Sequence, residues 1–64
     1  MGKNEELLTV QQVAAWLKVP VATIYQWRYR GEGPRGIRVG RYVRYRRADV
    51  DAFLNERMDP RPAA

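Results

Sequence analysis

The chain contains no cysteine and no histidine among its 64 residues. Without cysteine there is neither a disulfide nor a thiolate zinc site to stabilise so small a domain. Without histidine the chain lacks the commonest general base and the commonest metal ligand in proteins. No nucleophile stands beside a suitable base either, so we expect a protein that is not an enzyme and that uses no metal and no cofactor.

Long apolar runs are also absent from the sequence. No segment approaches the roughly 20 consecutive apolar residues that a membrane-spanning helix needs, and no apolar run follows Lys3 as it would in a signal peptide. These absences predict a cytoplasmic protein without a membrane partner. A chain of this length forms one domain at most, and its hydrophobic core is necessarily small.

Charge of one sign is what the sequence has in excess. It holds twelve basic and seven acidic residues, for a net charge of +5. All of the basic residues except Lys3 and Lys18 are arginine, whose planar guanidinium matches phosphate oxygens and the edge of guanine. A dispersed charge would serve solubility alone. Here six arginines fall between positions 35 and 47, and such clustering favours a nucleic-acid partner.

Two short helices are predicted in the first half of the chain, with a tight corner between them. Thr9 and Gln12 form a capping box, and apolar residues then repeat at the spacing of an amphipathic helix. This helix ends near Lys18, since the residue before Pro20 is biased out of the helical conformation. The second helix, 21–30, ends at a glycine, and the pair predicts a helix-turn-helix. The expected inner faces are Val10, Val13, Ala14 and Leu17, then Val21, Ile24 and Trp27.

A basic hairpin is predicted after a glycine-rich loop at 31–36. Residues 37–45 alternate apolar and basic side chains on both sides of Gly40, which supplies the positive φ of a hairpin turn. Arg41 and Tyr42 then lie at or near the tip. The alternation predicts that a core-facing set, Ile37, Val39, Val43 and Tyr45, lies opposite an outward-facing set, Arg38 and Arg44.

The last predicted element is a helix from Ala48 to about Met58, with Val50, Phe53 and Leu54 on its inner side. We expect Trp27 and Phe53 to belong to the core rather than to stack on a ligand. The fold class is mainly α with a small β-hairpin, in the order of a winged helix-turn-helix: helix-turn-helix, two-stranded wing, C-terminal helix. Its expected divisions are a flexible N-terminus at 1–7, the DNA-binding domain at 8–58 and a disordered tail at 59–64.

The outer side of the second helix suits the major groove of DNA. Gln26 can bond adenine through two hydrogen bonds, Ala22 is small enough to meet a thymine methyl group, and Arg30 can contact guanine or phosphate. Tyrosines on this outer side argue against the alternative, a merely solvated surface helix. The predicted recognition-helix residues are Ala22, Thr23, Tyr25, Gln26, Tyr29 and Arg30.

The hairpin supplies the second part of the predicted DNA-binding site. The alternative is a solvated basic hairpin, but such a density of like charges repels itself unless phosphates neutralise it. Arg41 and Tyr42 near the tip are suited to a minor groove, whose narrow form attracts arginine. The predicted DNA-binding residues of this wing are Arg35, Arg38, Arg41, Tyr42, Arg44 and Arg46.

Four stretches in this order resemble the excisionase group of MerR-like winged-helix proteins: 8–17 (LTVQQVAAWL), 21–27 (VATIYQW), 37–41 (IRVGR) and 45–54 (YRRADVDAFL). The resemblance covers about fifty of the 64 residues. It implies a recognition helix in the major groove around Thr23, Tyr25 and Gln26. It also implies a wing, 38–44, on the adjacent minor groove or backbone.

The same resemblance implies a role in bacteria or phage-infected cells. Phage excisionases of this group bind several adjacent DNA sites, bend the DNA and steer an integrase toward excision, so neighbouring copies and an integrase are expected partners beside double-stranded DNA. AlpA-like members are small transcription regulators, which is the alternative function. A protein-interaction or RNA-binding module is a third hypothesis, although the deep, narrow major groove of RNA would not admit the second helix.

Overall fold

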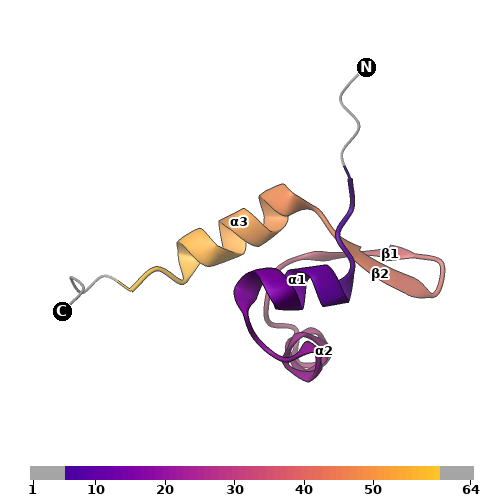
Figure 1. Cartoon of the computed structure of the whole chain (residues 1–64), viewed down its shortest axis with the longest axis horizontal. Coiled ribbons are helices and arrows are strands. Elements are labelled where there is room, and N and C mark those ends of the chain that lie inside the picture. The colour runs from indigo at the N-terminus through magenta and orange to yellow at the C-terminus, as the bar shows by residue number, and fades with distance from the viewer. Residues whose placement is uncertain (1–5, 60–64) are drawn as a thin grey trace, which may run out of the picture.

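The computed structural model describes residues 6–59, and the expected flexible N-terminus and disordered tail fall largely outside this range. The element order is α1 (Val10–Leu17), α2 (Val21–Arg30), β1 (Gly36–Val39), β2 (Tyr42–Tyr45) and α3 (Arg47–Glu56). This is the predicted fold, a small winged helix-turn-helix (Figure 1). Helix α3 begins one residue and ends two residues before the limits of its predicted range, 48–58. In Figure 1 the hairpin and α3 extend to opposite sides of the α1–α2 pair.

Helix α1 begins and ends as its sequence predicts. The Gln12 amide donates to Thr9 Oγ1 at 3.0 Å, and the Thr9 amide donates to Gln12 Oε1 at 2.9 Å, which confirms the capping box. After α1, Lys18 adopts the left-handed conformation at φ 59°. The amides of Lys18 and Val19 donate back to carbonyls of the last turn at 3.3 and 3.0 Å. This pair of bonds is a Schellman motif, a common helix ending.

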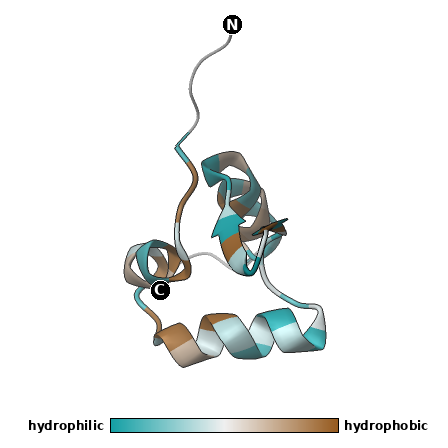
Figure 2. Ribbon diagram, turned by 90° about the vertical axis from the view of Figure 1, so that its right-hand side faces the viewer, coloured by the Kyte–Doolittle hydropathy of each residue, from teal (hydrophilic) through white to brown (hydrophobic). Residues whose placement is uncertain are grey.

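Helix α2 follows after a corner of three residues, 18–20. Pro20 precedes it in an extended conformation, and Gly31 ends it with a second pair of backward hydrogen bonds, from the Gly31 and Glu32 amides. Figure 2 shows α2 along its length, with its hydrophilic residues concentrated in the second half. The helix crosses beneath α1 rather than running beside it (Figures 1 and 2). Among the described residues no side chain caps its start.

The hairpin turn consists of Gly40 and Arg41 alone, because Val39 pairs directly with Tyr42. Gly40 has φ 62°, as predicted for a turn of this kind. The antiparallel register continues from that pair toward the root of the hairpin through Arg38↔Val43, Ile37↔Arg44 and Gly36↔Tyr45.

This register overturns the predicted division of the hairpin into a core face and a solvent face. Directly opposed residues share a face, so Ile37 and Val39 lie with Arg44 and Tyr42, not with Val43 and Tyr45. Val39, expected in the core, is 45% exposed. The prediction assigned faces by alternation along residues 37–45, whereas the two-residue turn pairs odd-numbered with even-numbered positions and so places them on the same face.

The hydrophobic core lies between α1, α2 and the root of the hairpin. Tyr45 is 1% exposed, as expected for a core residue, and Leu8 pairs with it as an isolated bridge. The Leu8 amide donates to the Tyr45 carbonyl at 2.7 Å, and the Tyr45 amide donates to the Leu8 carbonyl at 2.9 Å. The segment at Leu8 therefore pairs with the end of β2, on the edge opposite β1. The buried residues that form this core are Leu8, Val10, Val13, Ala14, Ile24, Tyr45 and Val50.

Helix α3 attaches through a few contacts. Val50 is fully buried, and Trp27 packs against the core, as predicted. Phe53 is half-buried at the edge of the core, where its ring lies 5.4 Å from that of Trp27. The guanidinium of Arg47 stacks 5.1 Å above Trp16 and links the start of α3 to α1. The prediction that Leu54 faces inward is wrong. It is 36% exposed, because the stripe that packs inward is only as wide as Val50 and Phe53.

Candidate nucleic-acid interface

The outer face of α2 is exposed along its whole length. Tyr29 is 93% and Tyr25 is 51% exposed, and Ala22, Gln26 and Arg30 are exposed as well. Thr23, the remaining predicted recognition residue, is half-buried at the edge of this face. The face follows from the helical period, since the opposite residues of α2 pack into the core. A continuous surface of polar, aromatic and small side chains is thus available to a ligand.

Arg28 is a residue of α2 that the sequence analysis did not single out. It is half-buried, and it forms a side-chain hydrogen bond with Tyr45 beneath the hairpin. Burial raises the pKa of the Tyr45 hydroxyl, an effect that the charge and hydrogen bond of Arg28 partly oppose. Position 28 follows Ile24 by one helical turn, and this spacing assigns it to the inner side of α2. Arg28 thereby fixes α2 against the root of the hairpin.

The Arg28 side chain occupies space that is free because Gly36 has no side chain. A Cβ atom at position 36 would lie 2.8 Å from Arg28 Nη1 and 3.3 Å from Tyr45 Cε1, both closer than ordinary contact. Here the glycine is required by close approach of a neighbour rather than by its backbone angle. The connection between α2 and the hairpin therefore depends on three residues, Arg28, Gly36 and Tyr45.

The hairpin exposes a mixture of cations and apolar side chains. Arg38, Arg41 and Arg46 are exposed, whereas Arg44 is half-buried. The Arg44 guanidinium lies 5.1 Å above the Tyr42 ring, and its Nη1 donates to the carbonyl of the preceding residue at 2.9 Å. Tyr42 is nevertheless 55% exposed. With the 45% exposed Val39 directly opposite, it gives the tip an apolar edge.

A groove of about 320 Å³ joins α2 to the hairpin. Tyr25 of α2 lines it together with Arg41, Tyr42 and Arg44 of the hairpin, and the start of α1 forms its remaining wall. Two cations and several hydroxyl groups facing one groove match the chemistry of a phosphate backbone. The structure thus brings together residues from both predicted halves of the site.

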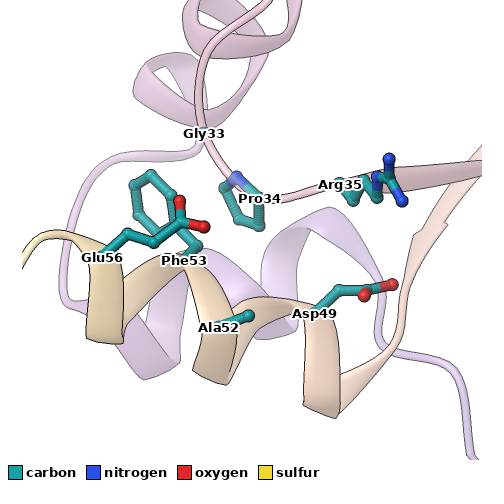
Figure 3. Close-up of a pocket in the computed structure, with 7 residues that line it drawn as sticks. All are labelled: Gly33, Pro34, Arg35, Asp49, Ala52, Phe53 and Glu56. Atoms are coloured by element: carbon teal, nitrogen blue, oxygen red, sulfur yellow. The ribbon is translucent and has the colours of Figure 1, made fainter.

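A second cleft, of about 350 Å³, separates the loop at 33–35 from α3 (Figure 3). Arg35 and Asp49 lie at one end of this cleft, and Glu56 and Phe53 lie at the other. Arg35 thus lies at the same end of this cleft as the Asp49 carboxylate. Because acidic side chains repel phosphate, this cleft is a poor site for nucleic acid.

Charge is segregated along the molecule. Residues 35–47 contain six arginines and no acidic residue, whereas three acidic residues, Asp49, Asp51 and Glu56, lie on α3. Across residues 6–59 we find no group of three acidic, histidine or cysteine side chains that could hold a metal ion. Over the same range, no helix is long and apolar enough to cross a membrane.

The fold and this basic surface define a small DNA-binding protein of the winged helix-turn-helix class, whose partner is double-stranded DNA. Residues 7–58 match the family model described as a helix-turn-helix domain, and the chain belongs to this family. Searches of curated proteins and of solved structures returned no significant match.

Proposed function

We propose that this protein is an excisionase-type accessory factor of recombination, which binds adjacent sites on attachment DNA and bends the duplex. In this role it directs an integrase toward prophage excision in the cytoplasm of a bacterial host. The observation that carries the proposal is the tip of the hairpin, where the half-exposed side chains of Val39 and Tyr42 stand directly opposite each other among arginines.

In this proposal α2 lies in the major groove. Ala22 and Gln26, both exposed on the outer face, reach base edges, while Thr23 and the free amides at the start of α2 hold a phosphate. Arg30, at the last position of the helix, contacts guanine or phosphate. The N-terminal residues of a recognition helix are those that reach furthest into the groove, and the exposure of the first turns of α2 supports this docking.

The DNA backbone then passes through the groove between α2 and the hairpin. Arg41 and Arg44 line this groove beside the Tyr25 hydroxyl, so one phosphate can receive charge-assisted and neutral hydrogen bonds together. Arg38 and Arg46, which are exposed, supply the other phosphate contacts of the wing, whereas Arg35 lines the cleft with Asp49 and is left out of the proposed interface.

The hairpin tip enters the adjacent minor groove in the proposed complex. Proteins that bend DNA insert apolar side chains between base steps, and the resulting kinks reach about 20–90°. Val39 and Tyr42 form one apolar edge, and Arg41 in the turn supplies the positive charge that a narrow minor groove attracts. Bending is the property that separates an accessory factor of recombination from a protein that only occupies its site.

Neighbouring copies strengthen the binding. A single module of this kind offers about 600–1,000 Å² of interface, which limits the specific affinity of one copy. We therefore expect an isolated site to bind much more weakly than an array of adjacent sites. Equal affinity per site for the isolated site and the array would contradict cooperation between copies.

The test is excision of attachment DNA by the cognate integrase, with and without this protein. Excision should require the protein, and equal excision in its absence would refute the directing role. The double variant Val39→Ser/Tyr42→Ser keeps every arginine of the hairpin, so it should lose bending and excision by a larger factor than it loses affinity, as measured by circularly permuted probes. Leu54→Ser removes an exposed apolar side chain from α3 and is the matched control, with no expected loss.

If the protein binds DNA without bending it, and represses a promoter instead, the alternative of a small transcription regulator replaces the proposed role.

A further inference from the structure

Within α2, every residue of which is described, no cation stands at the centre of the outer face. The helix contains two arginines. Arg28 turns inward beneath the hairpin, and Arg30 is the last residue of α2, on the flank of the outer face. Arginine and lysine are the side chains that read guanine in the major groove. The centre of this face therefore has no residue of the type that selects a G·C pair.

The centre carries apolar and aromatic groups instead. Ala22 and Tyr29 lie in one row with Gln26, and Tyr25 stands beside this row. A shallow depression on the surface is lined by Tyr25, Gln26, Tyr29 and Arg30. On the major-groove edge of DNA, the apolar group is the C5-methyl of thymine, and the base that glutamine bonds through two hydrogen bonds is adenine. The chemistry of the row thus matches A·T pairs.

We infer that α2 selects a short run of A·T pairs, with Gln26 bonding adenine and with Ala22, Tyr25 and Tyr29 packing on thymine methyl groups. The inference rests on the proposed binding of α2 in the major groove. From Ala22 to Tyr29 the helix rises about 10 Å, which covers about three base-pair steps at 3.4 Å each. The run read by one copy is therefore about four pairs long.

The experiment removes the methyl groups from the DNA without altering the protein. Duplexes are first selected from a random pool with the full chain, and thymidine is then replaced by deoxyuridine in the selected site. This exchange deletes the C5-methyl but preserves the hydrogen-bonding edge of the base. We expect about fourfold weaker binding for each contacted methyl group, measured by gel shift at fixed salt.

Variants of the protein identify which residue senses the methyl group. Tyr29→Ala should bind the thymidine and deoxyuridine duplexes more nearly alike, and it should fold normally because Tyr29 is 93% exposed. Arg30→Ala is the matched control on the same helix end. This variant should lower the affinity for both duplexes by the same factor and leave the ratio of the two affinities unchanged.

Two results would overturn the inference: equal affinity for the two duplexes, or selection of a site rich in G·C pairs. If the protein still binds and bends DNA in either case, the proposed function stands and the A·T preference alone is wrong. If no duplex is retained from the pool, the inference and the proposed function fail together.

Discussion

Arg28 is the residue whose side chain crosses from the recognition helix to the hairpin. It bonds Tyr45 inside the molecule and passes over Gly36 on the way, where no Cβ atom stands. A buried hydrogen bond to a charged group is worth about 1.5–3 kcal/mol. These three residues therefore set the angle between α2 and the hairpin, although none of them needs to touch DNA.

Gly36→Ala should lower the free energy of unfolding by about 1–2 kcal/mol, because the added methyl group displaces Arg28 and crowds Tyr45. Most of this loss should disappear in an Arg28→Ala background, as a double-mutant cycle in urea would measure. Gly40→Asn is the control, since nothing lies within 4 Å of a Cβ there and asparagine tolerates positive φ. An equal loss in both backgrounds would exclude the contact with Arg28 as the cause.

Tyr45 should make the protein sensitive to alkaline pH. Its pKa is raised in the folded state by burial, whereas an unfolded tyrosine titrates near pH ~10. Below that pH both states keep the proton and the contribution to stability is complete. Above it the unfolded state releases the proton first, so the free energy of unfolding falls, by at most about 1.4 kcal/mol per pH unit, until the folded pKa is passed.

The measurement is urea unfolding at about pH 9 and about pH 11. Tyr45→Phe keeps the buried ring but cannot ionise, and its stability should fall less over the same interval. If the variant loses as much stability as the parent protein, the buried phenol is not the source of the pH dependence.

At the scale of elements, the helices were predictable from local signals and the faces of the hairpin were not. The capping box at Thr9, the proline at 20 and the glycine at 31 each act on their immediate neighbours, and the bounds of α1 and α2 agree with them. The face of Val39 depends on how many residues the turn contains. A stretch that alternates on both sides of Gly40 allows Val39 to share a face either with Val43 and Tyr45 or with Tyr42 and Arg44. The pairing across the turn decides between the two.

The candidate site was predictable to a similar extent. The outer face of α2 follows from the helical period, so the exposed positions of Tyr25 and Gln26 could be assigned without coordinates. The tertiary positions of the arginines could not be. Whether Arg35 lies with the hairpin or beside α3, and whether Arg28 turns inward, is determined by packing between elements that are distant in sequence.

Helix α1 ends at a lysine in a conformation that suits glycine. Lys18 has φ 59° and ψ 45°, and its side chain is exposed. Lys18→Gly should therefore raise the free energy of unfolding by about 0.5–1 kcal/mol through relief of strain. Thermal unfolding of Lys18→Gly and Lys18→Ala would test this, because alanine removes the charge but keeps the strain. A gain in the alanine variant would point to charge instead.

At the scale of the whole molecule, the segregation of charge governs how the protein meets DNA. The arginine-rich segment at 35–47 and the acidic residues of α3 lie on different elements, and the hairpin and α3 extend to opposite sides of the helix pair (Figure 1). A duplex approaching from any direction is attracted at the hairpin and repelled at the acidic part of α3. Such a field orients a protein before contact and raises its association rate.

The dependence of binding on salt should report the number of neutralised phosphates. If about six phosphates are contacted, the logarithm of the affinity should fall with the logarithm of the salt concentration, with a slope of about −5. The double variant Arg38→Ala/Arg41→Ala should make the slope shallower by about 2 and lower the affinity for all DNA sequences alike. Arg57→Ala, just past the C-terminal end of α3, should remove a charge without changing the slope. An unchanged slope in the hairpin variant would mean that Arg38 and Arg41 do not contact phosphates.

The pairing of Leu8 with Tyr45 has a mechanical consequence. Tyr45 is clamped on both sides, by β1 and by Leu8, at the root of a hairpin whose tip is free. A force that a bound duplex exerts on Val39 or Tyr42 at the tip therefore bends the hairpin about its root, where Tyr45 is held. The torque passes into α1 through the N-terminal segment and into α2 through Arg28. A substitution that loosens the packing around Tyr45 should therefore reduce bending even though it leaves the tip unchanged.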